Sequence, residues 1–211
     1  MVRAPSLERM RRHWDRQSAG YDQKMDRAER LFGDTRTWVC RQATGRVLEV
    51  AVGTGLNLSL YPEEAAVTGM DLSPAMLDLA RKRAAELGRD VDLRVGDAQR
   101  LEFEDASFDT VVCTFGLCAV PDDGGAVDEM VRVLRPGGLL LLADHVVSTS
   151  APIRLLQAAI ELYSVPVENE HFRRRPIEHV MAAGLAILRH DRFKKGIVER
   201  VTARKPTPPV L

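Results

Sequence analysis

The sequence is poor in cysteine and aromatic residues, and it has no long apolar run. Its three cysteines, Cys40, Cys113 and Cys118, form no Cys-x-x-Cys pair, which favours free thiols in a reducing cytoplasm over disulfides or structural zinc. No apolar run reaches the roughly 18–20 residues that a membrane-spanning helix needs, and the first residues lack the apolar segment of a secretory signal. With 5% aromatic residues, the arginines lack interleaved side chains that would stack on bases, so no nucleic-acid partner is expected.

The net charge of zero conceals a separation of charge along the chain. Residues 1–46 hold 11 basic and 6 acidic side chains, residues 47–170 hold 9 and 21, and residues 171–211 hold 10 and 3. Both ends are therefore basic, while the middle is acidic. This pattern fits solvated helix faces, or it fits basic ends that grip an anionic substrate or a lipid surface.

From Val47 onward, strand-like and helix-like segments alternate, which predicts a parallel sheet covered by helices on both faces. The best-marked helix, 73–88, has Ser73 for its N-cap, Pro74 for its first turn and Gly88 for its end. The predicted strands are 46–52, 67–73, 91–97, 107–120, 139–146, 185–193 and 197–205; the other predicted helices are 122–138, 152–163 and 177–183. Ligands of such sheets bind at the carboxyl ends of the strands.

The first 46 residues precede the sheet and predict two helices packed over this rim. Apolar residues recur there at helical spacing, with arginines between them: Leu7, Met10, Trp14, Tyr21, Met25, Ala28 and Leu31. At the other end of the chain, the last two strands suit a hairpin around Lys195 and Gly196.

The loop after the first strand carries glycines and an acidic residue. Gly53 and Gly55 are not followed by the third glycine of a dinucleotide-binding turn, because Leu58 stands in that place. Glu49 would repel a pyrophosphate by about 1–4 kcal/mol at 4 Å, so a ligand with a cationic part suits the loop better. S-adenosylmethionine has such a part: Glu49 would face its ammonium directly or through water, while backbone N–H groups near Gly53 and Gly55 receive its carboxylate.

Two further carboxylates end the next two strands. Asp71, 22 residues after Glu49, can accept both ribose hydroxyls, and Asp97 can accept the adenine amino group. Alternatively, Asp71 only begins a helix and Asp97 only ends a strand. The remaining predicted cofactor contacts are Leu72, Met76 and Ala98 around the adenine, and Thr114 and Phe115 beside the methionine part.

The segments VLEVAVGTGLNL, GMDLSPAML, VGDAQRLEFEDASFDTVVCTFGL and MVRVLRPGGLLLLADHV resemble the successive motifs of class I S-adenosylmethionine-dependent methyltransferases. The group that makes ubiquinone and menaquinone is the most similar. The resemblance implies a doubly wound, Rossmann-like, mostly parallel sheet of seven strands with one antiparallel edge strand. It also places Ala51 where the family usually has its first glycine, and alanine suits this position on the expectation that its φ is negative.

The chain is expected to be one methyltransferase domain, 1–211. Residues 1–45 would form a helical lid, 46–148 the cofactor-binding core, and 149–205 the acceptor region and final strands. Methyl transfer is an in-line displacement, so positioning and exclusion of water matter most. The family places a Tyr-Asp pair over the cofactor; here Tyr21 matches it and would close the methionine pocket. His145 is the predicted general base or acceptor-orienting group. Either side chain could instead be structural, and no metal is expected.

The predicted acceptor is a small molecule, such as an aromatic, quinone-like or secondary metabolite, methylated at O, C or N. The alternative is a phospholipid headgroup methylated on nitrogen at a membrane surface. Segment 7–32 is amphipathic and rich in arginine, which would suit peripheral contact with an anionic membrane at its cytoplasmic face. A nucleic-acid-binding or nucleic-acid-modifying module and a non-catalytic cofactor-binding protein are the alternatives from other classes. The oligomeric state stays open.

Overall fold

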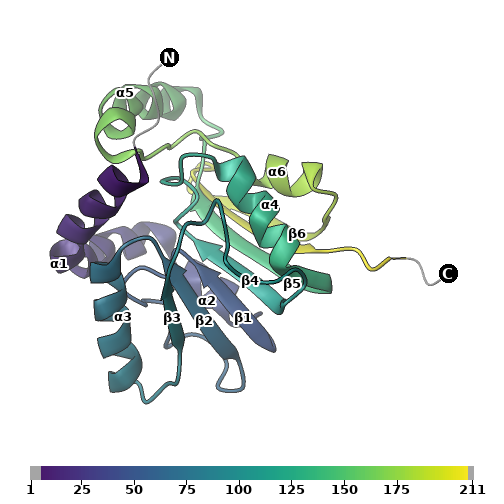
Figure 1. The fold of residues 1–211 in the computed structure, drawn as a ribbon. Coiled ribbons are helices and arrows are strands. Elements are labelled where there is room, and N and C mark those ends of the chain that lie inside the picture. Colours follow the sequence, from purple (N-terminus) through teal and green to yellow (C-terminus); the bar gives the residue numbers. More distant parts are fainter. Residues whose placement is uncertain (1–5, 209–211) are drawn as a thin grey trace.

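The computed structural model describes residues 6–208, except for the side chains of residues 27–31. Within that part, the chain forms a seven-stranded sheet in the order β3-β2-β1-β4-β5-β7-β6 (Figure 1). The strands are β1 Arg46–Val50, β2 Ala66–Asp71, β3 Asp92–Val95, β4 Phe108–Thr114, β5 Leu134–His145, β6 Ala186–Phe193 and β7 Val198–Arg204. The helices are α1 Leu7–Phe32, α2 Thr35–Cys40, α3 Pro74–Glu86, α4 Asp123–Val133, α5 Ala151–Glu168 and α6 Pro176–Ala182.

Two apolar clusters cover the two faces of this sheet. Neighbouring strand residues alternate between them, so that Val111 packs with α4 and α6, while Val112 packs with α2 and α3. Strands buried on both faces need apolar residues throughout, which explains the near-continuous apolar runs in the sequence. The predicted doubly wound architecture is confirmed.

The predicted hairpin at the end of the chain is also confirmed. Lys194, Lys195 and Gly196 turn the chain with positive φ angles of 53°, 56° and 76°. β7 pairs antiparallel with both β5 and β6, so the antiparallel strand lies one place inside the outermost strand β6. β7 is mostly buried, whereas β6 is charged and largely exposed, as suits a strand that must not pair with other molecules.

Two helix ends differ from the prediction. α4 ends at Val133, ahead of Pro136, and β5 begins at once with Leu134. Gly137 (φ 79°) and Gly138 fall within this strand, and a Cβ on Gly138 would lie 2.8 Å from the Asp109 carbonyl oxygen. Pro-Gly-Gly therefore marks an irregular strand start where β4 and β5 come close. α5 is longer than predicted and includes Pro166.

The N-terminal helices divide between two places. α1 lies over the carboxyl ends of the strands as predicted, whereas α2 packs on one face of the sheet through Val39 and Cys40. The side chains of Ala28 and Leu31, which belonged to the helical spacing, lie outside the described residues.

The expected negative φ of Ala51 is wrong. Ala51 has a φ of 58°, like Gly53 at 57°, because the chain reverses sharply after β1. A Cβ on an L-residue costs about 1–2 kcal/mol in this conformation. The side chain is also confined, since a Cβ on Gly116 would lie 2.7 Å from the Ala51 Cβ. Ala51 is therefore a strained position that tolerates nothing larger.

Ala51→Val should lower the free energy of unfolding by roughly 1–2 kcal/mol, because a β-branched side chain is poorly tolerated at positive φ. Ala51→Gly is the matched control and should be at least as stable as the wild type, since glycine adopts this φ freely. Urea denaturation followed by circular dichroism measures both. Equal stability of the valine and glycine variants would contradict the strain assigned to this turn.

Candidate active site

A pocket of about 840 Å³, counting the space at its opening, lies at the carboxyl ends of β1, β2, β3 and β4. The site spans the point where the strand order reverses beside β1, and α1 roofs it. Most predicted contacts line it: Tyr21, Ala51, Gly53, Asp71, Leu72, Met76, Asp97, Ala98, Thr114 and Phe115. Glu49, Gly55 and His145 do not.

The Asp71 carboxylate is built into the floor of the pocket. Its Oδ2 accepts a hydrogen bond from the Gly53 backbone N–H at 2.9 Å, and its Oδ1 accepts one from the Ser73 N–H at 2.9 Å. Burial raises its pKa, while these backbone donors favour the charged form. Each carboxylate oxygen has a second lone pair, so Asp71 can still accept hydroxyl donors from a ligand.

Glu49 requires a correction: it does not contact the pocket. Its side chain is 1% exposed and lies beneath the glycine loop. Its Oε1 accepts from Asn57 Nδ2 at 2.6 Å, and its Oε2 accepts from the Tyr61 hydroxyl at 2.9 Å. Both carboxylate oxygens help to hold the loop, so this placement does not support a direct contact with an ammonium group, and a contact through water stays a prediction. Sequence position predicted the strand end, but not that two side chains would cover it.

The free energy of unfolding should fall as the pH rises from about 5 to about 8, because of Glu49. Burial raises its pKa from 4.5 to about 7, so the folded chain binds a proton more tightly than the unfolded chain. The stabilisation is present below the unfolded pKa and is lost as pH rises through the folded pKa. Glu49→Gln should remove roughly 1 kcal/mol or more of this pH dependence, measured by urea denaturation at both pH values. Identical slopes for the variant and the wild type would contradict it.

Gly55 supports the loop from inside instead of touching the ligand space. A Cβ there would lie 2.8 Å from the Leu58 side chain and 3.3 Å from the Ala80 backbone, at a φ of 80°. Glycine is therefore needed for close packing of the loop on α3 and not for contact with a ligand.

Sequence reasoning missed Arg36, a buried cation in the pocket wall. Its Nη1 donates to Thr114 Oγ1 at 2.9 Å and to Asn57 Oδ1 at 3.1 Å, and its guanidinium lies 5.1 Å from the Phe115 ring centre. A guanidinium at this end of the pocket suits a ligand carboxylate. Nothing in the sequence separates this arginine from the exposed ones, because α2 is too short to show which face is buried.

α1 is fastened over the pocket by two of its own carboxylates. Asp22 accepts from Thr54 Oγ1 at 2.6 Å and pairs with Arg83 of α3 at 2.5 Å. About two turns earlier, Asp15 accepts from Ser73 Oγ at 2.5 Å, at the start of α3. Between them, burial raises the pKa of Tyr21 to about 12, so its hydroxyl stays protonated at neutral pH.

His145 lies behind the pocket. Its Nδ1 is 3.5 Å from Asp144 Oδ1, and its ring stacks on Phe172 with centroids 4.7 Å apart. Its buried Nε2 has no hydrogen-bond partner among the described residues. Asp144 accepts from the backbone N–H of Cys118, and the neighbours Gly116 and Ala119 line the pocket. His145 is therefore separated from the pocket by one loop.

Cys118, Asp144 and His145 bring ligand atoms within 4.8 Å of one another, which sequence spacing did not reveal. Both Asp144 oxygens already accept backbone hydrogen bonds, from Cys118 and His145. Burial also raises the pKa of the Cys118 thiol, whereas a metal ligand must be the thiolate. The expectation of no metal stays a prediction.

A family model described as a methyltransferase domain matches residues 48–142. The demethylmenaquinone methyltransferase of Clavibacter sepedonicus is 31% identical over 184 residues, which cover 76% of this chain and 74% of that protein. This chain belongs to the S-adenosylmethionine-dependent methyltransferases. Its predicted resemblance to the class I enzymes of the quinone-biosynthesis group is thereby confirmed.

A second relative of this methyltransferase is named for a different acceptor. The phosphatidylethanolamine N-methyltransferase of Cereibacter sphaeroides is 44% identical over 118 residues, or 55% of this chain and 58% of that protein. The matched region therefore spans less than two thirds of that relative. A solved Bacillus halodurans chain shares the fold, with a TM-score of 0.71 at 20% identity over 83% of this methyltransferase and 100% of that chain. No described helix is long and apolar enough to cross a membrane.

Proposed function

We propose that the protein transfers the methyl group of S-adenosylmethionine to a small-molecule acceptor of aromatic or quinone-like chemistry. The observation that carries the proposal is Asp71, a buried carboxylate that lines the pocket and is oriented by two backbone N–H groups. In this proposal it accepts the ribose hydroxyls. Asp97 accepts the adenine amino group, and Leu72, Met76 and Ala98 pack around the adenine ring.

The methionine part would lie at the opposite end of the pocket. Arg36 would hold its carboxylate, because the Gly53 N–H already donates to Asp71. Thr114 and Phe115 would lie beside it. Tyr21 covers this end from α1: a Cβ on Gly53 would lie 4.0 Å from the Tyr21 ring. S-adenosylmethionine supplies the activated methyl group when bound, and the chain supplies alignment and exclusion of water.

The residue divisions expected from the sequence belong to this proposal. Residues 1–45 would act as the lid, 46–148 as the cofactor core and 149–205 as the acceptor region. Segment 169–171 supports the last assignment: Asn169 Nδ2 donates to the Ala119 carbonyl at 2.8 Å, and the His171 N–H donates to the Cys118 carbonyl at 2.9 Å. These bonds hold the acceptor region against the loop that lines the cofactor pocket. The proposed location is the cytoplasm.

A second candidate acceptor is a phospholipid headgroup amine, and Glu170 favours it. This half-buried side chain forms no hydrogen bond or ion pair with any described residue. Burial raises its pKa, which His145 and Lys24 lower by their charge. It also lies close enough to Tyr21 to raise that residue's pKa. A carboxylate near the methyl donor suits a cationic acceptor, and one relative is named as a phosphatidylethanolamine N-methyltransferase.

The deciding experiment supplies methyl-labelled S-adenosylmethionine with two defined acceptors. One is a reduced naphthoquinone that lacks the ring methyl group, and the other is phosphatidylethanolamine in vesicles. Label in the naphthol supports the first acceptor, and label in the lipid supports the second. Absence of transfer to either, and to lipid and aqueous cell extracts, overturns the proposed activity. Calorimetry with S-adenosylhomocysteine tests the cofactor site separately.

A further inference from the structure

α5 buries polar side chains and exposes apolar ones, which is the reverse of the usual amphipathic helix. Of its 18 residues, the structure buries Gln157 and Ser164, both of them polar. Six large apolar side chains are instead exposed: Leu155 at 75%, Leu156 at 59%, Ile160 at 42%, Leu162 at 81%, Tyr163 at 67% and Val167 at 43%. A helix in a globular protein normally places its apolar stripe against the core and its polar stripe in water. The outer face of α5 therefore lacks a partner within the described chain.

The inner polar stripe of α5 is fully used for attachment. The side-chain amide of Gln157 donates to the carbonyls of Val146 and Phe172 at 2.8 and 2.9 Å, and its carbonyl accepts from the Ser148 N–H. Four residues later, Glu161 accepts from the Phe172 N–H at 2.7 Å. These bonds fix the orientation of the helix, so the apolar face cannot turn inward without leaving buried backbone groups unpaired.

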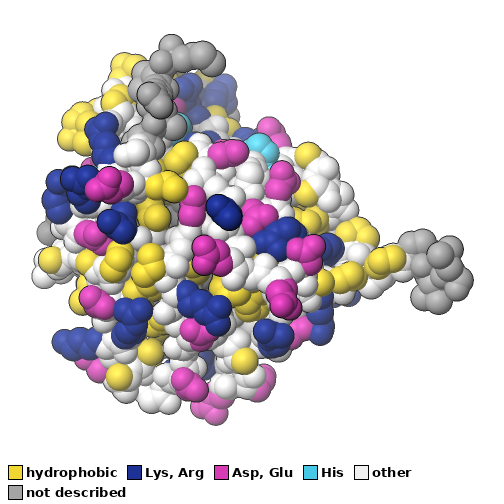
Figure 2. All heavy atoms as spheres, viewed as in Figure 1, with side chains coloured by type: hydrophobic (Ala, Val, Ile, Leu, Met, Phe, Trp, Pro, Cys, Tyr) yellow, Lys and Arg dark blue, Asp and Glu magenta, His cyan; other side chains and the backbone are white. Residues whose placement is uncertain are grey.

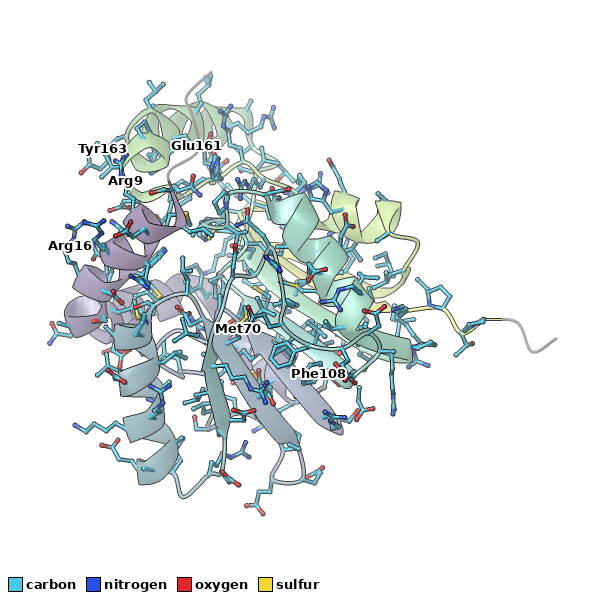
Figure 3. All side chains as sticks on the ribbon, viewed as in Figure 1. Arg9, Arg16, Met70, Phe108, Glu161 and Tyr163 are labelled. Atoms are coloured by element: carbon cyan, nitrogen blue, oxygen red, sulfur yellow. The ribbon has the colours of Figure 1, made fainter. Side chains whose placement is uncertain are left out.

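Arginines of α1 border this apolar face. Figure 3 shows Tyr163 of α5 and Arg9 and Arg16 of α1 at the same outer end of the molecule, away from the sheet. Arg9 Nη2 donates to the Pro166 carbonyl at 3.2 Å, which joins the two helices directly. Arg11, Arg12, Arg16 and Arg154 are exposed as well. In Figure 2, hydrophobic side chains at the top of the molecule lie beside Lys and Arg side chains on the left.

Three acidic side chains near this face are turned away from it or already paired, whereas the side chains of Glu168 and Glu170 at the end of α5 form no hydrogen bond or ion pair with any described residue and offset part of the positive charge. Asp15 points to the start of α3, Glu161 pairs with Arg173 at 2.6 Å, and Glu8 pairs with Arg12. The surface is thus an apolar patch with a surplus of positive charge. A second copy of the chain would need an acidic complement to these arginines, whereas a bilayer that contains anionic lipid offers both apolar depth and negative charge.

We propose that the outer face of α5, together with the arginines of α1, docks the protein on an anionic lipid bilayer. The cofactor pocket shares this end of the molecule, because Leu7, Met10 and Trp14 of α1 line it while the arginines of the same turns face outward. Docking would therefore bring the membrane next to the roof of the pocket. This inference adds a membrane partner to the proposed function. The biological purpose of docking rests on that function, whereas the docking itself rests on the exposed face of α5 and the arginines of α1.

Co-sedimentation tests the docking with vesicles of phosphatidylcholine, either alone or mixed with phosphatidylglycerol. The wild type should bind the mixed vesicles at 0.1 M salt and lose most binding at 0.5 M. Leu155→Ser with Leu162→Ser should weaken binding about tenfold or more, and so should Arg11→Glu with Arg16→Glu. Matched controls elsewhere, Leu87→Ser with Leu188→Ser and Arg81→Glu with Lys82→Glu, should bind as the wild type does.

Calorimetry with S-adenosylhomocysteine on each variant separates the two proposals. Unchanged cofactor affinity shows that a variant is folded, and absent cofactor binding in the wild type would count against the proposed function alone. Failure of the wild type to bind mixed vesicles, or equal binding by the leucine pair, overturns the docking surface. So does a dimer in sedimentation equilibrium that the leucine pair abolishes, because the face then belongs to a second copy.

Discussion

A His145→Ala variant will bind S-adenosylhomocysteine as tightly as the wild type but transfer methyl groups about a hundredfold more slowly. His145 lies behind the pocket loop and not against the cofactor, so its loss should spare cofactor affinity. Its buried Nε2 has no partner among the described residues, so the proposed role requires an acceptor that reaches this atom past the pocket loop. General-base catalysis typically contributes 10²–10⁴-fold. Single-turnover rates and calorimetry measure the two quantities.

A second variant separates this role from packing. If His145 takes a proton, His145→Gln should be as slow as the alanine variant, because a glutamine amide cannot act as a base. His179→Ala is the matched control, since that histidine is on α6 and pairs with Asp123. Equal losses of rate and cofactor affinity would assign His145 to packing against Phe172.

Asp71→Ala will weaken binding of S-adenosylhomocysteine roughly 10- to 100-fold, or about 1–3 kcal/mol, the scale of a buried charge-assisted hydrogen bond. The substitution also removes the acceptor of the Gly53 and Ser73 N–H groups. Asp78→Ala is the matched control, because that carboxylate is exposed on α3 and pairs with Arg81.

A 2′-deoxyribose analogue of the ligand distinguishes ribose recognition from loss of loop structure. The wild type should bind this analogue more weakly than the parent ligand, whereas Asp71→Ala should bind both about equally. A variant that still discriminates between the two ligands would remove the ribose assignment, even if its overall affinity fell.

The sequence predicted the fold best at positions where a residue type has a single structural role. Ser73 caps α3 as predicted, and its side chain accepts from the Met76 N–H. The near-continuous apolar runs form strands that are buried on both faces of the sheet. Most of the pocket could be placed because the carboxyl ends of adjacent parallel strands meet at one rim. Asp71 and Asp97 reached that rim by topology alone.

Side-chain contacts between distant segments could not be predicted in this way. Glu49 ends the correct strand, but Asn57 and Tyr61 cover it, so its carboxylate serves the loop. Arg36 enters the pocket from a short helix whose pattern gives no sign of burial. The positive φ of Ala51 follows from the sharp turn of the chain after β1, which outweighs the preference of alanine for a negative φ. The exposure of α5 was hidden as well, because its apolar content alone would suit a core helix.

The helix above the pocket is attached partly by polar contacts, through Asp15 at Ser73 and Asp22 at Thr54 and Arg83. Such contacts weaken with ionic strength, whereas the apolar seams of the sheet do not. Raised ionic strength should therefore loosen the contact of this helix with α3 at the Asp22–Arg83 ion pair before it affects the sheet beneath.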